Sequence, residues 1–281
     1  MPLLPRRRPG RPYLAGAPLL TAHRGGARLA PENTVAAFRQ AIDVWGADML
    51  EMDVHLTSDG EVVVLHDETV DRTTDGSGRV ADLTLAELEA LDAGARFIDD
   101  QGGAPFAGRG VRIPRFEEVL TAFPTIRLNV ETKCRAVAKP LVDRILAHGA
   151  QARVLVAAEH ESHRRAVRGY AGPWGASRGQ LQRFWLLHRT PFSRCYTPSA
   201  DVLQVPVSWE GREVVTPRLV AEAHARNLPV HVWVVDEEDE MRRLLALGVD
   251  AIQTDRPDRL ARVLHEETGR PLPPGLTGAG R

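Results

Sequence analysis

Short apolar runs typical of β-strands recur along this chain, and segments with helical periodicity separate nearly all of them. The runs centre near residues 20, 50, 63, 128, 155, 175, 203, 232 and 252. Strands that alternate with helices form a parallel sheet covered by those helices. About eight or nine strands suit a closed TIM (β/α)8 barrel better than an open doubly wound sheet. No dinucleotide-binding glycine fingerprint follows the first run. We therefore predict an α/β fold of the TIM-barrel type.

The composition is that of an ordinary globular protein. With 281 residues, 43% of them hydrophobic and 26% charged, the chain can bury the core of one barrel-sized domain or of two smaller ones. A formal net charge of −1 gives no reason to expect a nucleic-acid partner. The sequence contains no run of about twenty apolar residues that would span a membrane, and prolines and glycines interrupt any signal-peptide core. Cys134 and Cys195 form no disulfide framework, so we expect a cytoplasmic protein.

Changes in composition predict the limits of the barrel. Residues 1–17 are rich in proline, glycine and arginine, and residues 266–281 are rich in proline and glycine, so both are expected to be flexible tails. The barrel domain is then expected to cover residues 18–265. Within it, residues 68–110 lack a strong strand pattern and are expected to form an insertion at one end of the barrel.

The stretch Asp48–Asp67 carries the first functional signal. It predicts a strand with Glu51 and Asp53 two residues apart, so both carboxylates point to the same face. A second apolar run, Val62–Leu65, predicts a parallel strand buried on both faces, and it ends at His66. Two acids on one face and a histidine at a strand end indicate a metal site beside an acid/base group.

Two neighbouring residues are given other roles. Asn33 is predicted to cap the N-terminus of a helix whose apolar face carries Val35, Phe38, Ile42 and Trp45. His55 follows Asp53 on the same face, but it is expected to lie past the strand end at the rim, so we leave it out of the metal site.

The mouth of a parallel barrel collects the residues at the carboxyl ends of its strands. Three carboxylates crowded there would raise one another's pKa values, and a divalent cation would relieve the repulsion. Ligation by oxygen alone favours Mg²⁺ or Ca²⁺, with Mn²⁺ also suitable, over zinc. At the ends of the predicted strands near residues 20, 50, 63 and 128 lie His23, Arg24, Glu51, Asp53, His66, Glu131 and Lys133.

Such a mouth suits a phosphate ester. A metal ion and Lys133 would neutralise the negative charge that builds on the phosphate oxygens in the transition state. One histidine would accept a proton from the attacking hydroxyl and the other would donate one to the leaving alcohol. Because a diester has a poor leaving group, two histidines on different strands favour a phosphodiesterase.

Several motifs occur together in the order and spacing of a known family. The chain resembles the glycerophosphodiester phosphodiesterase family from about Leu19 to Leu264. The motifs that carry the resemblance are His23-Arg24-Gly25, Pro31-Glu32-Asn33-Thr34, Glu51-Met52-Asp53-Val54, Leu56-Thr57-Ser58-Asp59-Gly60, His66-Asp67, Ile113-Pro114, Glu131-Thr132-Lys133, Val232-Trp233-Val234 and Gly248 to Pro257.

The resemblance implies a TIM barrel with a small insertion after the second histidine, and hydrolysis of a small-molecule glycerophosphodiester to sn-glycerol 3-phosphate and an alcohol. It also implies roles for individual residues. The acid/base pair would be His23 and His66; the ligands of the divalent cation would be Glu51, Asp53 and Glu131; the phosphate and substrate contacts would be Arg24, Lys133 and Trp233.

The chain departs from the family pattern after the middle strand. Ala157 and Ala158 replace a common Ser-Phe pair, and the Glu159 and His160 that follow would suit recognition of a different, cationic or polar head group. The segment 172–197 matches the family weakly. Two alternatives therefore stand beside hydrolysis: a phospholipase D-like or cyclising lyase activity on lysophospholipid or sphingolipid head groups, and a non-catalytic binding protein, which would be expected to lose a histidine or a ligand.

Overall fold

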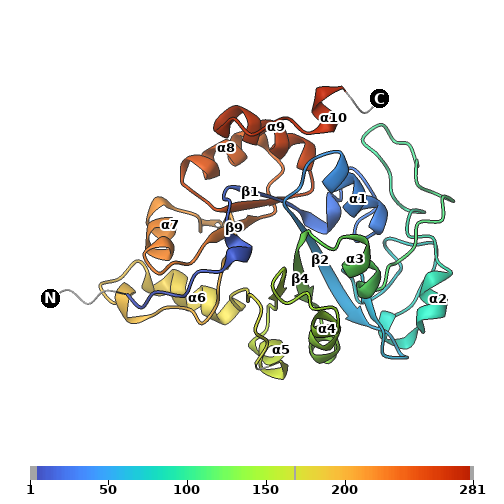
Figure 1. The fold of residues 1–281 in the computed structure, drawn as a ribbon, viewed down its shortest axis with the longest axis horizontal. Coiled ribbons are helices and arrows are strands. Elements are labelled where there is room, and N and C mark those ends of the chain that lie inside the picture. Colours follow the sequence, from blue (N-terminus) through green and yellow to red (C-terminus); the bar gives the residue numbers. More distant parts are fainter. Residues whose placement is uncertain (1–4, 168, 279–281) are drawn as a thin grey trace.

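The computed structural model describes residues 5–167 and 169–278 as a barrel of strands surrounded by helices (Figure 1). Its strands are β1 Leu19–Ala22, β2 Met49–Leu56, β3 Val62–Val64, β4 Arg127–Thr132, β5 Val154–Ala157, β6 Leu203–Pro206, β7 Ser208–Trp209, β8 Arg212–Glu213, β9 Val230–Trp233 and β10 Ala251–Thr254. Its α-helices are α1 Val35–Asp43, α2 Leu85–Glu89, α3 Phe116–Ala122, α4 Arg135–Ala147, α5 Glu161–Ala166, α6 Arg178–Leu187, α7 Pro217–His224, α8 Glu238–Ala246, α9 Pro257–Thr268 and α10 Pro274–Thr277. Short 3₁₀ helices cover Pro12–Leu14, His23–Gly25, Val80–Asp82 and Ser193–Cys195.

The parallel strands curl into a barrel. They pair in the order β5-β4-β2-β1-β10-β9-β6. Single parallel bridges from Val156 to Trp174 and from Gly175 to Val202 connect the two ends of this row. The segment at 174–175 therefore takes the place of a strand between β5 and β6, and the predicted TIM-type α/β barrel is confirmed.

One sequence prediction about the barrel is wrong. Val62–Val64 (β3) does not join it as a parallel strand but pairs antiparallel with β2, with Val54 opposite Val64 and Leu56 opposite Val62. The apolar run is buried for another reason: Val63 and Leu65 pack on Val80 and Leu88 in a small core under the segment 68–110. Apolar composition alone does not distinguish a barrel strand from a covered hairpin strand.

The hydrophobic core has two parts. The larger part lies between the outer faces of the strands and the helices, with residues such as Phe38, Leu128 and Val232 fully buried. A smaller cluster fills the inside of the barrel and includes Leu19 and Met49. Inward-facing side chains fill a barrel of about eight strands, so only its mouth is open for a ligand.

The terminal segments contact the barrel where the structure describes them. The Tyr13 hydroxyl donates a hydrogen bond of 2.9 Å to the Leu128 carbonyl, and Arg270 forms an ion pair with Asp48 at 2.6 Å. The predicted tails also include residues 1–4 and 279–281, which lie outside the described residues, and the domain limits stay a prediction. In the described part of the chain, every helix is too short or too polar to cross a bilayer.

Buried His231 on β9 generates a stability prediction. Burial lowers its pKa to about 4 from 6.5, although Asp250 nearby opposes the shift. Between these pH values the unfolded chain binds a proton that the folded chain does not, so stability is lost as the pH falls, by up to about 3 kcal/mol. Denaturant unfolding at several pH values should show a shallower acid dependence for His231→Gln than for the wild type. An unchanged slope in His231→Gln, or an equal change in His148→Gln at an exposed site, would contradict this assignment.

Candidate active site

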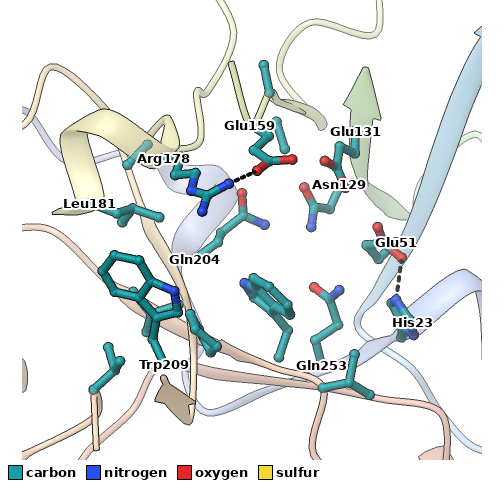
Figure 2. Close-up of a pocket in the computed structure, with 18 of the residues that line it drawn as sticks. His23, Glu51, Asn129, Glu131, Glu159, Arg178, Leu181, Gln204, Trp209 and Gln253 are labelled. Carbon is teal, nitrogen blue, oxygen red and sulfur yellow. Dashed lines mark hydrogen bonds and ion pairs between the residues drawn. The ribbon is translucent and has the colours of Figure 1, made fainter. Parts of the chain in front are cut away.

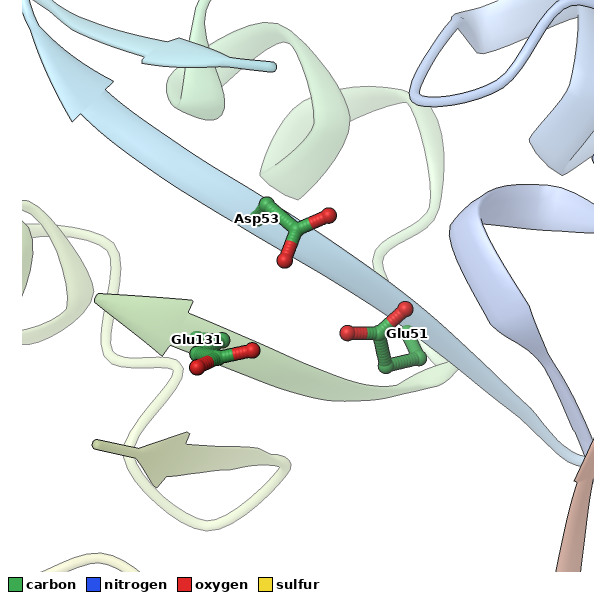
Figure 3. A group of neighbouring side chains, drawn as sticks. All are labelled: Glu51, Asp53 and Glu131. Carbon is green, nitrogen blue, oxygen red and sulfur yellow. The ribbon is translucent and has the colours of Figure 1, made fainter. Parts of the chain in front are cut away.

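The three predicted metal ligands lie side by side on two neighbouring strands (Figure 3). In the parallel pairing of β2 with β4, Asp53 lies opposite Glu131, and Glu51 lies two residues earlier on β2 on the same face. Each residue offers a carboxylate oxygen, and these oxygens all lie within 4.8 Å of one another. Glu51 and Asp53 are 3% and 1% exposed. A hard divalent cation fits this donor set, because it prefers several carboxylate oxygens in one place.

The electrostatics of the cluster are uneven. Burial, together with the neighbouring carboxylates of Asp53 and Glu131, raises the pKa of Glu51 to about 8. Burial would also raise the pKa of Asp53, but Lys133 and Arg24 more than offset this and lower it. Asp53 lies 2.9 Å from the Lys133 ammonium and 3.3 Å from Arg24 Nε. The cluster therefore contains more buried negative charge than its two cations neutralise, which is the condition that a bound cation relieves.

The loop after β1 brings His23 and Arg24 to this cluster. Arg24 adopts a left-handed backbone conformation with φ of 50°, and its backbone N–H donates to Glu51 at 3.0 Å. Gly25 follows with φ of 85°, and a Cβ there would come within 2.7 Å of the Ala37 side chain. The tight approach to α1 therefore requires glycine and fixes the path of the loop.

Each predicted acid/base histidine is held by an aspartate. His23 Nδ1 lies 2.6 Å from Asp255, and His66 Nδ1 lies 2.6 Å from Asp67. The aspartates contact Nδ1 and not Nε2; both histidines line the cavity described below, and His23 Nε2 lies 3.9 Å from Glu51. Burial alone would lower the pKa of His23, but the carboxylates of Glu51 and Asp255 outweigh it and raise the pKa. A carboxylate on Nδ1 fixes both the tautomer and the ring orientation.

His66 reaches the mouth although β3 is not a barrel strand. Strand β2 continues past the barrel edge, and β3 returns antiparallel, so that the Leu65 N–H donates to the Asp53 carbonyl at 3.0 Å. Buried His55 completes the support, because its Nε2–H donates to the His66 carbonyl at 3.0 Å. The expectation that His55 lies past the strand end is therefore wrong: it lies within β2 opposite Val63, where the antiparallel pairing with β3 buries it, and it positions the His66 backbone.

An ion-pair chain connects the phosphate-binding candidate Arg24 to His66. Glu32 accepts from Arg24 at 2.9 Å and from Arg72 at 2.7 Å, and Arg72 donates at 2.6 Å to Asp67. Arg72 belongs to the segment 68–110. This segment therefore contributes to the position of a catalytic candidate, which its irregular sequence did not indicate.

Two buried amides were missed by sequence reasoning. Asn33 is not the helix cap: Thr34 caps α1, and Asn33 instead donates to Asp53 at 3.0 Å and accepts from its backbone N–H. Asn129, 3% exposed, lines the cavity, and its side-chain oxygen has no hydrogen-bond partner among the described residues. The sequence signal for Asn129 was its position two residues before Glu131 on the same predicted strand, which places both side chains on one face.

All eight predicted site residues line one cavity of about 550 Å³ at the barrel mouth. Figure 2 shows His23, Glu51, Asn129 and Glu131 on one side of it. Trp233 lies on the cavity wall and is 42% exposed. The geometry thus combines a cation-binding carboxylate cluster, two cationic side chains and two histidines around one space.

Comparison with known proteins identifies the family. Residues 23–259 match the glycerophosphoryl diester phosphodiesterase family. A glycerophosphodiester phosphodiesterase of Caldanaerobacter subterraneus subsp. tengcongensis is 36% identical over 255 residues, which are 88% of this chain and 98% of that protein. Human lysophospholipase D GDPD1 is 28% identical over 295 residues, 87% of this chain and 85% of that protein.

Solved structures share the fold. A glycerophosphoryl diester phosphodiesterase domain from Mycobacterium tuberculosis has a TM-score of 0.80 at 23% identity, covering 90% of this chain and 100% of that one. A phosphodiesterase from Oleispira antarctica, solved with the product sn-glycerol-3-phosphate, has a TM-score of 0.70 at 23% identity and covers 88% of this chain and 97% of that one. The resemblance and the enzyme class predicted from the sequence are confirmed: the chain belongs to the glycerophosphoryl diester phosphodiesterase family of phosphoric diester hydrolases.

Proposed function

We propose that this chain hydrolyses glycerophosphodiesters to sn-glycerol 3-phosphate and an alcohol, with a divalent cation and two histidines. The observation that carries the proposal is the placement of two aspartate-held histidines around a buried cluster of three carboxylates in one cavity. The Oleispira antarctica relative, which binds sn-glycerol-3-phosphate, supports the product. The substrate is a small molecule. The cytoplasmic location expected from the sequence stays a prediction.

Glu51, Asp53 and Glu131 would hold the cation, Mg²⁺ or Ca²⁺ with Mn²⁺ also suitable. When bound, this ion supplies positive charge to the phosphate oxygens as negative charge builds on them. Arg24 and Lys133 add fixed positive charge at the same place, and Trp233 provides an apolar wall for the substrate. The raised pKa of Glu51 indicates a carboxylate cluster that is under-neutralised without a cation.

The histidines move the protons. One of them accepts a proton from the attacking water through Nε2, while the other donates a proton to the oxygen of the departing alcohol. Asp255 and Asp67 accept a hydrogen bond from Nδ1–H, which stabilises the protonated ring and fixes its orientation. If a hydroxyl of the substrate attacks instead of water, the same groups produce a cyclic phosphate, which is the lyase alternative.

The first experiment is phosphorus NMR of glycerophosphocholine incubated with the full chain and Mg²⁺ or Ca²⁺. We expect sn-glycerol 3-phosphate to appear, with kcat reduced about 10²–10⁴-fold in His23→Ala and in His66→Ala because each removes a proton-transfer group. The exposed His148→Ala is the matched control and should keep full activity. Retained activity in both active-site variants would refute the mechanism, and a cyclic product would select the lyase.

Metal binding gives a second prediction. A cation that binds only the folded chain stabilises it by roughly 3 kcal/mol at about 100 times its Kd. Thermal unfolding of the wild type should therefore shift upward on addition of Mg²⁺ or Ca²⁺, and chelator should abolish both this shift and activity. Glu131→Gln should reduce the shift because it removes one charged ligand, whereas Glu159→Gln, elsewhere in the same cavity, should not. Full activity in chelator would rule out the cation.

The aspartate that holds His23 gives a third prediction. Asp255→Asn should lower kcat roughly tenfold or more with little change in KM, because it loosens the orientation of the ring without removing a substrate contact. Asp255→Glu should restore part of the loss. Asp258→Asn, on the neighbouring α9, is the control. Equal changes in kcat and KM in Asp255→Asn and Asp258→Asn would mean that Asp255 has only a structural role.

A further inference from the structure

One stretch of the chain carries positive charge without any acidic counterpart. Residues 162–200 contain seven arginines and no aspartate or glutamate, whereas the whole chain has 36 lysines and arginines against 37 aspartates and glutamates. The stretch includes α6 and the loop after it, which contains the 3₁₀ helix Ser193–Cys195. A local excess of one sign of charge attracts molecules of the opposite sign.

The same stretch exposes two large apolar side chains. Leu186 on α6 is 61% exposed and Phe192 in the loop is 65% exposed, the highest values among the large hydrophobic residues that the structure describes. Both lie outside the cavity at the barrel mouth, so the proposed reaction gives them no role. Such side chains gain free energy when a partner removes them from water.

A buried arginine fixes the loop from beneath. The Arg226 side chain is 0% exposed, and its guanidinium donates to the carbonyls of Ser193 and Tyr196, the latter at 3.0 Å. It also pairs with Glu222 on α7 at 2.8 Å and lies 5.4 Å from the centroid of the Phe184 ring on α6. These contacts join α6, the loop and α7, which lie at the same edge of the barrel (Figure 1). The surface that they present is therefore fixed in the folded chain.

Arg183 lies beside the exposed leucine. It precedes Leu186 by three residues, so both side chains lie on one face of α6. Its guanidinium lies 5.4 Å from the centroid of the Tyr196 ring, and it forms no ion pair with a described residue. The outer face of α6 thus combines an apolar side chain with an unneutralised cation.

Two further arginines line a polar hollow between the loop and α7. Arg194 from the loop and Arg218 from α7 both contribute to this hollow, which has a volume of about 440 Å³. The one acid in its lining, Glu222, is engaged by Arg226. The two guanidinium groups therefore remain free for an anion such as a phosphate group, which accepts several hydrogen bonds from a planar guanidinium.

The N-terminal segment extends the positive charge. The Thr197 hydroxyl donates to the Arg6 carbonyl at 2.8 Å, which places this segment beside the loop. Arg6 and Arg7 are exposed, whereas Arg8 pairs with buried Asp201. We name the surface of Arg183, Leu186, Phe192, Arg194 and Arg218 the basic patch, and the N-terminal arginines lie at its edge.

The basic patch suits the surface of an anionic membrane better than a nucleic acid. Both partners offer phosphate groups to arginine. A bilayer also accepts apolar side chains at the boundary between headgroups and acyl chains, as Leu186 and Phe192 require. A nucleic acid offers stacked bases instead, and the aliphatic Leu186 has no flat face on which a base stacks.

We propose that this chain docks on membranes that contain anionic phospholipids, with Leu186 and Phe192 among the headgroups and the arginines of the basic patch at the lipid phosphates. Such interfacial binding needs no membrane-spanning helix. It is separate from the proposed hydrolysis, because all five residues of the basic patch lie outside the mouth cavity.

The test is sedimentation of the full chain with vesicles of phosphatidylcholine alone or of equimolar phosphatidylcholine and phosphatidylglycerol, at low salt and in chelator. We expect the partition coefficient to be at least about tenfold higher on the anionic vesicles, because each arginine near such a surface strengthens binding roughly fivefold. Added salt should weaken this binding, since ions screen exposed charges. Equal partition onto the two kinds of vesicle would overturn the proposal.

Variants locate the docking surface. Phe192→Asn removes an apolar contact and should lower the partition onto anionic vesicles about tenfold, and Arg218→Gln removes one charge and should lower it roughly fivefold. Ile98→Asn and Arg109→Gln change exposed residues of the segment 68–110 and are the matched controls, which should partition like the wild type. Unchanged partition in both patch variants, or equal losses in the controls, would contradict the proposal. Thermal unfolding should give the same Tm for all four variants, because each changes an exposed side chain.

Two competitors separate the basic patch from other modes of binding. Excess sn-glycerol 3-phosphate, which would occupy the mouth cavity, should leave the chain on the vesicles to the same extent as an equal concentration of sulfate. Specific release by sn-glycerol 3-phosphate would mean that the mouth holds the lipid, and it would overturn the proposal. Binding of a single-stranded oligonucleotide by a chain that does not bind anionic vesicles would identify a nucleic-acid surface instead and would overturn it as well.

Discussion

The repulsion among three carboxylates on two neighbouring strands is the constraint on which the rest of the mouth depends. Glu51 and Asp53 are almost fully buried, and Glu131 lies opposite Asp53 in the strand pairing. Buried charges of one sign are unfavourable unless cations lie beside them. Arg24 and Lys133 meet part of this requirement. The raised pKa of Glu51 indicates that negative charge remains unneutralised in the cluster. The local structure is thus prepared for a further cation rather than for close packing.

The histidines are positioned by a second layer of polar contacts. Asp255 and Asp67 fix the two rings, and Arg72 connects Asp67 through Glu32 to Arg24. Arg24 and His66, the candidates for phosphate binding and proton transfer, are therefore connected by one network of polar contacts. The irregular segment 68–110 takes part in it through Arg72, so it is more than a cover for β3. Such networks explain how long, flexible side chains keep a fixed geometry at a solvent-facing mouth.

Two sets of structural elements line the cavity. The barrel strands and the segments directly after them contribute the acids, cations and histidines, whereas α6 and the hairpin β7–β8 contribute Leu181 and Trp209 across the cavity. Helix α6 lies within the segment 172–197, which matches the family pattern weakly. The groups to which the proposed function assigns the reaction thus lie on the barrel strands and the loops that follow them, as is usual when loops around a barrel vary on a constant frame.

The sequence by itself determined the barrel and the residues of the carboxylate cluster, because both depend on short-range periodicity: strands alternate with helices, and residues two apart on a strand share a face, as Glu51 and Asp53 do. Only the tertiary structure decided which strands pair and which polar side chains contact one another. Strand β3 pairs antiparallel with β2, and Asn33 donates a hydrogen bond to Asp53 rather than capping α1. Asp255 lies 232 positions from His23, whose ring it contacts. The direction of an apolar strand and the partner of a polar side chain depend on contacts between distant segments, and local composition does not specify such contacts.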